Sequence, residues 1–182
     1  MRLSTLVVWI LCIAPTASHA DTGTTYEASL GVGRIRAISP RLVQPTVGPM
    51  AVLGLGIGRW LNSRASLAVR GVFGTCEVDS GGPDTFINFR GSGVREVVGM
   101  VAASMQLWFA NRLWVGAGFG GAFNQFSHPE RTGFASETGV GAYVRSGVTF
   151  AAFNVALEYG YTWMDSGYQW EMITLQLGYQ PH

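Results

Sequence analysis

Large apolar residues alternate with glycine and small polar residues in one segment of this chain after another. The pattern is clearest in residues 53–58, 115–120 and 153–161. Successive side chains of an extended strand point to opposite faces, so each segment has one apolar face and one face of small or polar residues. Small residues suit a narrow lumen filled by side chains. The alternation therefore predicts strands whose apolar faces point outward, toward lipid.

The composition supports an apolar outer surface. Charged residues make up 13 % of the chain and hydrophobic residues 48 %, whereas soluble domains carry about 25 % charged residues. The net charge of +1 argues against a nucleic-acid partner. All 12 basic residues are arginines. This fits either a codon bias or arginines that bind lipid phosphates at the rims of a barrel.

The first 20 residues have the pattern of a secretory signal peptide. A basic residue precedes an apolar run over residues 3–13, and small residues lead to a cleavage site near Ala20. The run is shorter than the roughly 20 residues that a membrane-spanning helix needs. Cys12 follows a bulky leucine within the run, which disfavours lipoprotein acylation. Cleavage leaves Cys76 as the one cysteine and excludes an intramolecular disulfide.

After the signal peptide, residues 21–182 contain eight strand-like segments. Most exceed the roughly 9–11 residues of a tilted membrane strand, and bacterial barrels have even strand numbers. Strands in lipid must close because open edges leave backbone groups unbonded. The predicted fold class is all-β, an eight-stranded antiparallel up-and-down transmembrane β-barrel. The predicted strands cover residues 25–36, 48–60, 64–76, 94–109, 113–126, 138–150, 153–163 and 168–180.

The connections alternate in length, as periplasmic turns and outer loops do in such barrels. Short connections are expected at 61–63, 110–112 and 151–152, and longer ones at 37–47, 77–93 and 127–137, whereas the remaining connection at 164–167 is brief. The short connections also predict the register of the strands. They place Ile57 opposite Leu67, Phe109 opposite Leu113, Phe150 opposite Phe153, and Arg145 opposite Glu158.

Several ionisable residues fall on the inward face. An isolated buried charge is very costly, so oppositely charged groups in a narrow lumen should pair. We expect an ion pair between Arg145 and Glu158. The structural interpretation is a salt-bridged plug, and the alternative is a gated polar channel that uses the same charges. The predicted interior network consists of Glu27, Arg70, Glu96, Arg145 and Glu158.

Aromatic residues gather near the strand ends and resemble the two interfacial girdles of membrane barrels. Counting alternate residues along each strand, which we call parity, however places Trp60, Trp108 and Trp114 on the inward face. There they would plug the periplasmic end. The expected girdles contain Tyr26, Trp60, Trp108, Phe109, Trp114 and Tyr179 at one end, and Phe126, Trp163, Tyr168 and Trp170 at the other.

No catalytic, metal-binding or cofactor-binding residue is expected. Ser127, His128 and Glu130 have the residue types of a hydrolytic site but are neighbours in one loop. The acidic residues of a second loop match no EF-hand spacing, and the glycine repeats lack the strand-turn-helix context of a nucleotide site. Those acidic residues are Glu77, Asp79 and Asp84.

The signal peptide, the eight alternating segments, the alternating short and long connections and the final strand together resemble the OmpA/OmpX-like β-barrel superfamily. In that strand Ile173, Leu175, Leu177 and Tyr179 alternate with smaller or polar residues. This ending is similar to the signal read by the barrel-assembly machinery, although three further residues follow Tyr179. The resemblance implies a location in the outer membrane of a Gram-negative bacterium, with the lipid bilayer and lipopolysaccharide as partners.

The expected protein is a monomeric, non-enzymatic barrel with a structural or surface-interaction role through its outer loops. Alternatives are an outer-membrane enzyme that modifies lipid A and a narrow solute channel. A soluble lipocalin-like barrel would have the opposite polarity, with an apolar interior.

Overall fold

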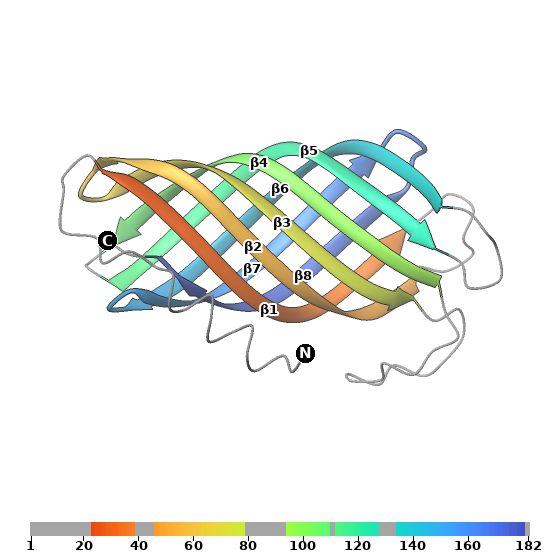
Figure 1. Cartoon of the computed structure of the whole chain (residues 1–182), viewed down its shortest axis with the longest axis horizontal. Coiled ribbons are helices and arrows are strands. Elements are labelled where there is room, and N and C mark those ends of the chain that lie inside the picture. Colours follow the sequence, from red (N-terminus) through yellow and green to blue (C-terminus); the bar gives the residue numbers. More distant parts are fainter. Residues whose placement is uncertain (1–22, 39–45, 79–93, 110–111, 128–133, 181–182) are drawn as a thin grey trace.

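The protein forms a closed barrel of eight antiparallel strands (Figure 1). The structure, a computed structural model, describes residues 23–38, 46–78, 94–109, 112–127 and 134–180. The predicted eight-stranded up-and-down topology is therefore confirmed. The strands are β1 (Thr24–Ile38), β2 (Thr46–Asn62), β3 (Ala65–Val78), β4 (Val94–Phe109), β5 (Leu113–Ser127), β6 (Phe134–Phe150), β7 (Phe153–Met164) and β8 (Gln169–Tyr179).

Each strand pairs with its neighbours in sequence, and β1 pairs with β8 to close the wall. The three short turns between β2 and β3, β4 and β5, and β6 and β7 lie at one end, on the left in Figure 1. Strand β1 begins and β8 ends at this short-turn end. The β7–β8 turn lies at the opposite end, which we call the outer end because the predicted outer loops join the strands there. Among the described residues, no helix has the length and hydropathy required to cross a bilayer.

Several predicted boundaries fall short of the observed strands, and the largest difference is at the start of β6. Strand β6 starts at Phe134 rather than at residue 138, because its backbone still pairs with β5 up to Ser127. Strand β2 likewise starts at Thr46, paired with Ala37 of β1. Strand pairing thus continues into segments whose composition predicts loops, since backbone hydrogen bonds do not depend on side-chain type.

Most of the predicted register is confirmed. Phe109 pairs with Leu113, Phe150 with Phe153, and Arg145 with Glu158.

The predicted pairing at the first short turn is wrong. Ile57 pairs with Val69, and Leu67 with Arg59, because the register shifts between Trp60 and Asn62. The backbone N–H of Arg64 donates to Asn62 Oδ1 at 2.8 Å, so the reversal is tighter than a three-residue loop. The error is two residues along the partner strand, and each side chain keeps its predicted face.

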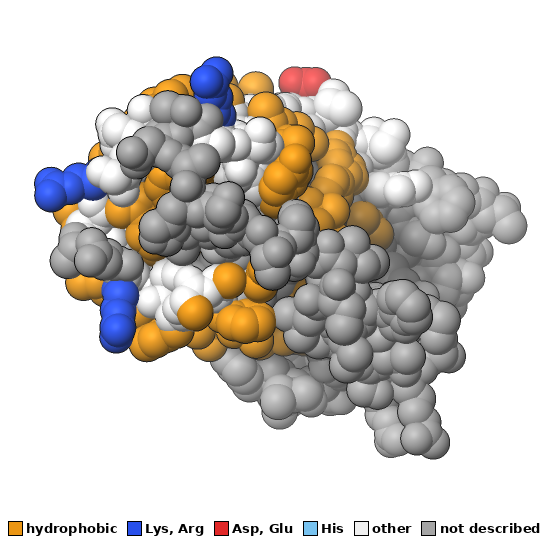
Figure 2. Space-filling view, turned by 60° about the vertical axis from the view of Figure 1, so that its left-hand side comes forward, with side chains coloured by type: hydrophobic (Ala, Val, Ile, Leu, Met, Phe, Trp, Pro, Cys, Tyr) orange, Lys and Arg blue, Asp and Glu red, His pale blue; other side chains and the backbone are white. Residues whose placement is uncertain are grey.

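The polarity of the barrel is inverted relative to a soluble protein. Outward residues include Val32 and Leu177, each 62 % exposed, whereas Arg70 and Glu158 inside the barrel are 1 % and 0 % exposed. Hydrophobic side chains form patches on the described part of the wall in Figure 2, between white backbone and small side chains. The predicted orientation of the two faces is therefore confirmed.

The turn between β6 and β7 offers a test of backbone strain. Ala151 has a φ of 56°, a region that costs an L-residue with a Cβ roughly 1–2 kcal/mol. We expect Ala151→Gly to raise the free energy of unfolding by up to about 1 kcal/mol, after the entropy cost of glycine. Urea unfolding of the refolded barrel, followed by gel mobility, measures this change.

The control is Ala152→Gly, since Ala152 has no positive φ. It should lower the free energy of unfolding by about 0.5–1 kcal/mol. Equal destabilisation by both substitutions would contradict strain at Ala151.

Candidate functional site

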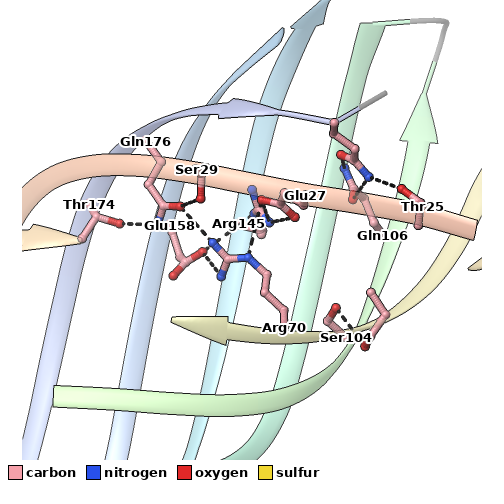
Figure 3. Close-up of polar contacts among 12 residues, drawn as sticks. Thr25, Glu27, Ser29, Arg70, Ser104, Gln106, Arg145, Glu158, Thr174 and Gln176 are labelled. Carbon is pink, nitrogen blue, oxygen red and sulfur yellow. Dashed lines mark hydrogen bonds and ion pairs between the residues drawn. The ribbon is translucent and has the colours of Figure 1, made fainter. Parts of the chain in front are cut away.

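Four charged side chains from four strands meet in the middle of the lumen (Figure 3). We call Glu27 of β1, Arg70 of β3, Arg145 of β6 and Glu158 of β7 the charge quartet. Arg70 Nη1 lies 2.7 Å from Glu158 Oε2, and Arg145 Nη1 lies 2.6 Å from Glu27 Oε1. The cross pairs are longer: 3.5 Å from Arg70 Nε to Glu27 Oε1, and 3.8 Å from Arg145 Nε to Glu158 Oε2.

The predicted contact between Arg145 and Glu158 is thus present as the longest of these four ion pairs. The residues are directly opposite in the register, but each head group finds a shorter contact across the lumen. In a barrel this narrow, side chains reach the opposite wall as easily as the neighbouring strand.

Glycines beside the quartet provide its space. Gly56 pairs with Glu27 on one side and with Arg70 on the other, and Gly116 pairs with Arg145. A Cβ at Gly54 would lie 2.7 Å from Arg70 Nη2. The alternating glycines of the sequence therefore leave the room that two guanidinium groups need.

Neutral groups complete the shell around the charges. Arg70 Nη2 donates to Gln176 Oε1 at 2.8 Å, which also accepts from Ser29 Oγ at 2.9 Å. Gln176 Nε2 donates in turn to Thr174 Oγ1. With two arginines and two glutamates the quartet has no net charge. Charges removed from water in this way stabilise only when pairing and hydrogen bonding are both extensive.

Aromatic rings cover both guanidinium groups. The guanidinium carbon of Arg145 lies 4.5 Å from the ring centre of Trp114, and that of Arg70 lies 5.2 Å from the ring of Tyr143. These cation–π contacts are strongest where water is excluded.

Glu96 does not belong to the charge quartet, which corrects the prediction of one five-residue network. It pairs with Cys76 in the β3–β4 register, whereas Arg70 pairs with Ala102. Six residues of strand separate the two positions, roughly 20 Å. Parity places a side chain on the inner face but leaves its height along the barrel to the strand register.

Glu96 instead has neutral partners near the outer end. Its Oε1 accepts from the Tyr168 hydroxyl at 2.8 Å and from Asn124 Nδ2, and Cys76 Sγ lies 3.9 Å from Oε2. Burial and the Glu96 carboxylate raise the pKa of Tyr168 above its ordinary value. Tyr168 therefore remains protonated and donates its hydrogen bond to Glu96.

Aromatic residues close the short-turn end from inside. We call Trp60, Trp108 and Trp114 the tryptophan cluster. The ring centres of Trp60 and Trp108 are 5.7 Å apart, and those of Trp108 and Trp114 are 6.1 Å apart. Trp114 is 1 % exposed. This confirms the inward direction predicted by parity. Tyr26 and Phe109, about half exposed, remain on the outer surface as girdle residues.

At the outer end, Tyr168 and Trp170 are buried in the lumen, so their assignment to the outer girdle is wrong. Trp170 pairs with Ala37 across the β1–β8 seam and shares its inward face. Trp163 of β7 is 46 % exposed and keeps the predicted outward position.

Sequence reasoning also missed an apolar layer between the quartet and Glu96. Parity was the signal that could have found it, since these residues alternate with outward ones in their strands. The layer includes Ile35, Met50, Val72, Val98, Met100 and Met172.

The lumen has little free space. A cavity of about 20 Å³ is lined by Glu27, Arg145, Tyr143, Gln106 and Gln180, among others. That volume accommodates about one water molecule. The described side chains thus pack the centre of the barrel as a plug.

Several residues singled out from the sequence lie outside the described residues. These are the signal peptide with Cys12, the acidic loop residues Asp79 and Asp84, and the loop residues His128 and Glu130. The side chains of Glu77 and Ser127 are likewise not described. Within the described ranges, no three carboxylate, cysteine or histidine side chains are grouped as metal ligands would be.

Comparison with known proteins shows similarity in structure but not in sequence. No protein-family model and no curated protein sequence matches the chain. Ail, the attachment invasion locus protein of Yersinia pestis, superposes with a TM-score of 0.59 and 14 % identity, covering 86 % of this chain and 97 % of Ail.

Two further structures give similar values. Neisserial surface protein A has a TM-score of 0.59 and 13 % identity, covering 86 % of this chain and 98 % of that protein. The N-terminal β-barrel domain of Pseudomonas aeruginosa OprF has a TM-score of 0.50 and 15 % identity, covering 86 % and 96 %. The chain shares the fold of these small outer-membrane barrels.

Loss of one quartet charge should be severe. We expect Glu158→Gln to lower the free energy of unfolding by about 3 kcal/mol or more, because it leaves a buried guanidinium without compensation. Urea titration of the refolded barrel measures this loss.

The matched control is Glu171→Gln, which removes the partner of Arg36 from an exposed ion pair of 3.3 Å. This substitution should cost less than about 1 kcal/mol. Similar losses of unfolding free energy in the two variants would contradict a strong electrostatic contribution of the quartet to stability.

Proposed function

We propose that the protein is an integral outer-membrane β-barrel with a plugged interior, and that it has a structural or surface-interaction role through its outer loops. The observation that carries the proposal is the belt of exposed apolar side chains around the barrel. All eight strands contribute, with Leu30, Leu55, Leu67, Val101, Phe119, Val144, Leu157 and Leu175 among them.

A belt of this kind fits lipid better than water. Soluble monomers rarely expose contiguous apolar patches larger than a few hundred Å². A closed barrel also satisfies its backbone hydrogen bonds within the wall, as the hydrocarbon region requires. The fold shared with outer-membrane barrels supports the same location.

The packed lumen favours a plug over a solute channel. The charge quartet is compensated in the centre, and the tryptophan cluster fills the short-turn end. The cavity beside the quartet is about 20 Å³, too small for a permeating solute.

The proposed partners follow from the two ends of the barrel. At the outer end Arg34 and Arg36 stand on the outward face of β1, where lipopolysaccharide phosphates would lie, and Arg36 also pairs with Glu171. The alternating strand β8 is the element that the barrel-assembly machinery would read during insertion. We further propose that the barrel is a monomer after removal of residues 1–20.

The surface-interaction role draws on one of the compared proteins. Ail is named for attachment and invasion, and one Ail structure contains the heparin analogue sucrose octasulfate. In this chain the corresponding role would fall to residues 39–45, 79–93 and 128–133, which join the strands at the outer end.

Location can be tested directly. We expect the protein to fractionate with outer membranes, to migrate faster on a gel before boiling than after, and to give no conductance in planar bilayers. Recovery in the soluble periplasmic fraction would refute the membrane assignment, and stable conductance would refute the plug. A change in lipid A mass on expression would reveal an enzyme instead.

A lipid-facing arginine provides a second test. Leu175 lies in the middle of β8 and is 56 % exposed. In a bilayer Leu175→Arg should cost about 2–4 kcal/mol, because arginine is expensive near the midplane. In a soluble barrel the same exposed substitution should cost little. Unfolding in lipid vesicles measures the difference.

The matched control is Phe150→Arg, since Phe150 is also 56 % exposed but ends β6 at the short-turn end. An arginine near the interface should cost at most about 1 kcal/mol. Equal costs at the two positions would contradict a bilayer around the barrel.

A further inference from the structure

The outer wall of the barrel has an apolar groove of about 460 Å³. It runs over β4 to β7, with Met105 and Leu107 on one side and Leu157 and Tyr159 on the other. The register explains the depression. Ala117 lies between Met105 and Val144, and Ser146 lies between Val115 and Leu157, so two small outward side chains are flanked by larger ones.

Two exposed arginines lie in the turns next to this groove at the short-turn end, beyond the residues that line it. Arg112 immediately precedes β5, and Val115 in the groove is three residues further, roughly 10 Å along the strand. Arg64 lies at the adjacent hairpin, where its carbonyl accepts from Trp108 N at 2.8 Å and the next residue, Ala65, pairs with Leu107 of the groove wall.

Among the described residues, the exposed charges at this end of the barrel have one sign. Arg59, Arg64 and Arg112 are exposed there, and basic side chains project at its edge in Figure 2. Among the described residues, the carboxylate nearest this end is Glu27, which points inward and is held by Arg145. At the outer end, by contrast, arginines are mixed with Glu137, Asp165 and Glu171.

We propose that the groove and its two arginines form a binding site for an anionic glycerophospholipid of the periplasmic leaflet. The inference rests on the proposed membrane location, in which the short turns face the periplasm. The lipid phosphate would lie against Arg64 and Arg112, and one acyl chain would fill the groove above Ala117 and Ser146. Arginine matches phosphate because its planar fork donates two parallel hydrogen bonds.

The charge pattern favours a lipid over a second copy of the chain. Two copies that meet side by side in one membrane, related by a two-fold axis along its normal, would bring the same ends together. Arg64 and Arg112 of each copy would then approach like charges in a region of low dielectric. An anionic lipid supplies both the opposite charge and the apolar chain.

Native mass spectrometry of the folded barrel in detergent micelles tests the site. The probes are palmitoyl-oleoyl phosphatidylglycerol and the phosphatidylcholine with the same chains. We expect one retained phosphatidylglycerol and much weaker retention of phosphatidylcholine. The double variant Arg64→Gln/Arg112→Gln should weaken phosphatidylglycerol binding by about tenfold or more, since each arginine near an anionic surface contributes roughly fivefold.

Matched variants separate the two halves of the site. Arg59→Gln removes an exposed arginine at the same end, on β2, which does not line the groove, and should leave binding unchanged. Ala117→Phe fills the groove and should weaken binding, whereas Val32→Phe on β1, away from the groove, should not. If Ala117→Phe does not fold, Ser146→Leu occupies the same groove.

Three results would overturn the proposal: equal retention of the two lipids, equal loss with Arg59→Gln and with the double variant, or a dimer that Ala117→Phe abolishes. The last would assign the groove to a second copy. Each variant is first shown to be folded by its gel mobility before boiling. Failure of the membrane location would appear in fractionation, whereas failure of this site would appear with a folded, membrane-inserted barrel.

Discussion

Closure of the wall is the constraint on which the other features depend. Backbone groups in hydrocarbon must find partners within the protein, and pairing of β1 with β8 removes the last open edges. With eight strands the lumen is only wide enough for side chains. Inward residues must therefore be small, or must fit against residues from the opposite wall. The inward glycines are small, whereas the charge quartet and the tryptophan cluster fit against residues of other strands. All three arrangements suit the small diameter of the lumen.

Polar and apolar layers follow one another along this lumen. The tryptophan cluster fills the short-turn end, the quartet occupies the middle, an apolar layer with Met100 and Met172 follows, and Glu96 lies near the outer end. The layers differ in how they satisfy polar groups. The quartet is compensated by opposite charges, whereas Glu96 depends on neutral donors. The outer wall is more uniform, because exposed apolar side chains come from all eight strands.

Parity along each strand is a local property, and the sequence predicted what depends on it. The outward-facing and lumen-facing residues, the eight strands and the pairing of Arg145 with Glu158 all follow from alternation and turn length. What failed has two origins. The bulge between Trp60 and Asn62 and the separation of Glu96 from the other four charges depend on how neighbouring strands pair. The inward direction of Trp170, by contrast, follows from the alternation within β8. An aromatic residue at a strand end suits either a headgroup layer or a lumen, so composition alone could not place Trp170.

The origin of the quartet has a consequence for assembly. Its members come from β1, β3, β6 and β7, so Glu27 meets Arg145 only when strands far apart in the chain have joined. Neighbouring strands already bring opposite charges together, since Arg70 faces Glu27 across β2 and Arg145 pairs with Glu158 of the next strand. The two shortest ion pairs, by contrast, join the β1–β3 part of the wall to the β6–β7 part. The closest charge pairing therefore belongs to the closed barrel, where it links the first strands of the chain to the last.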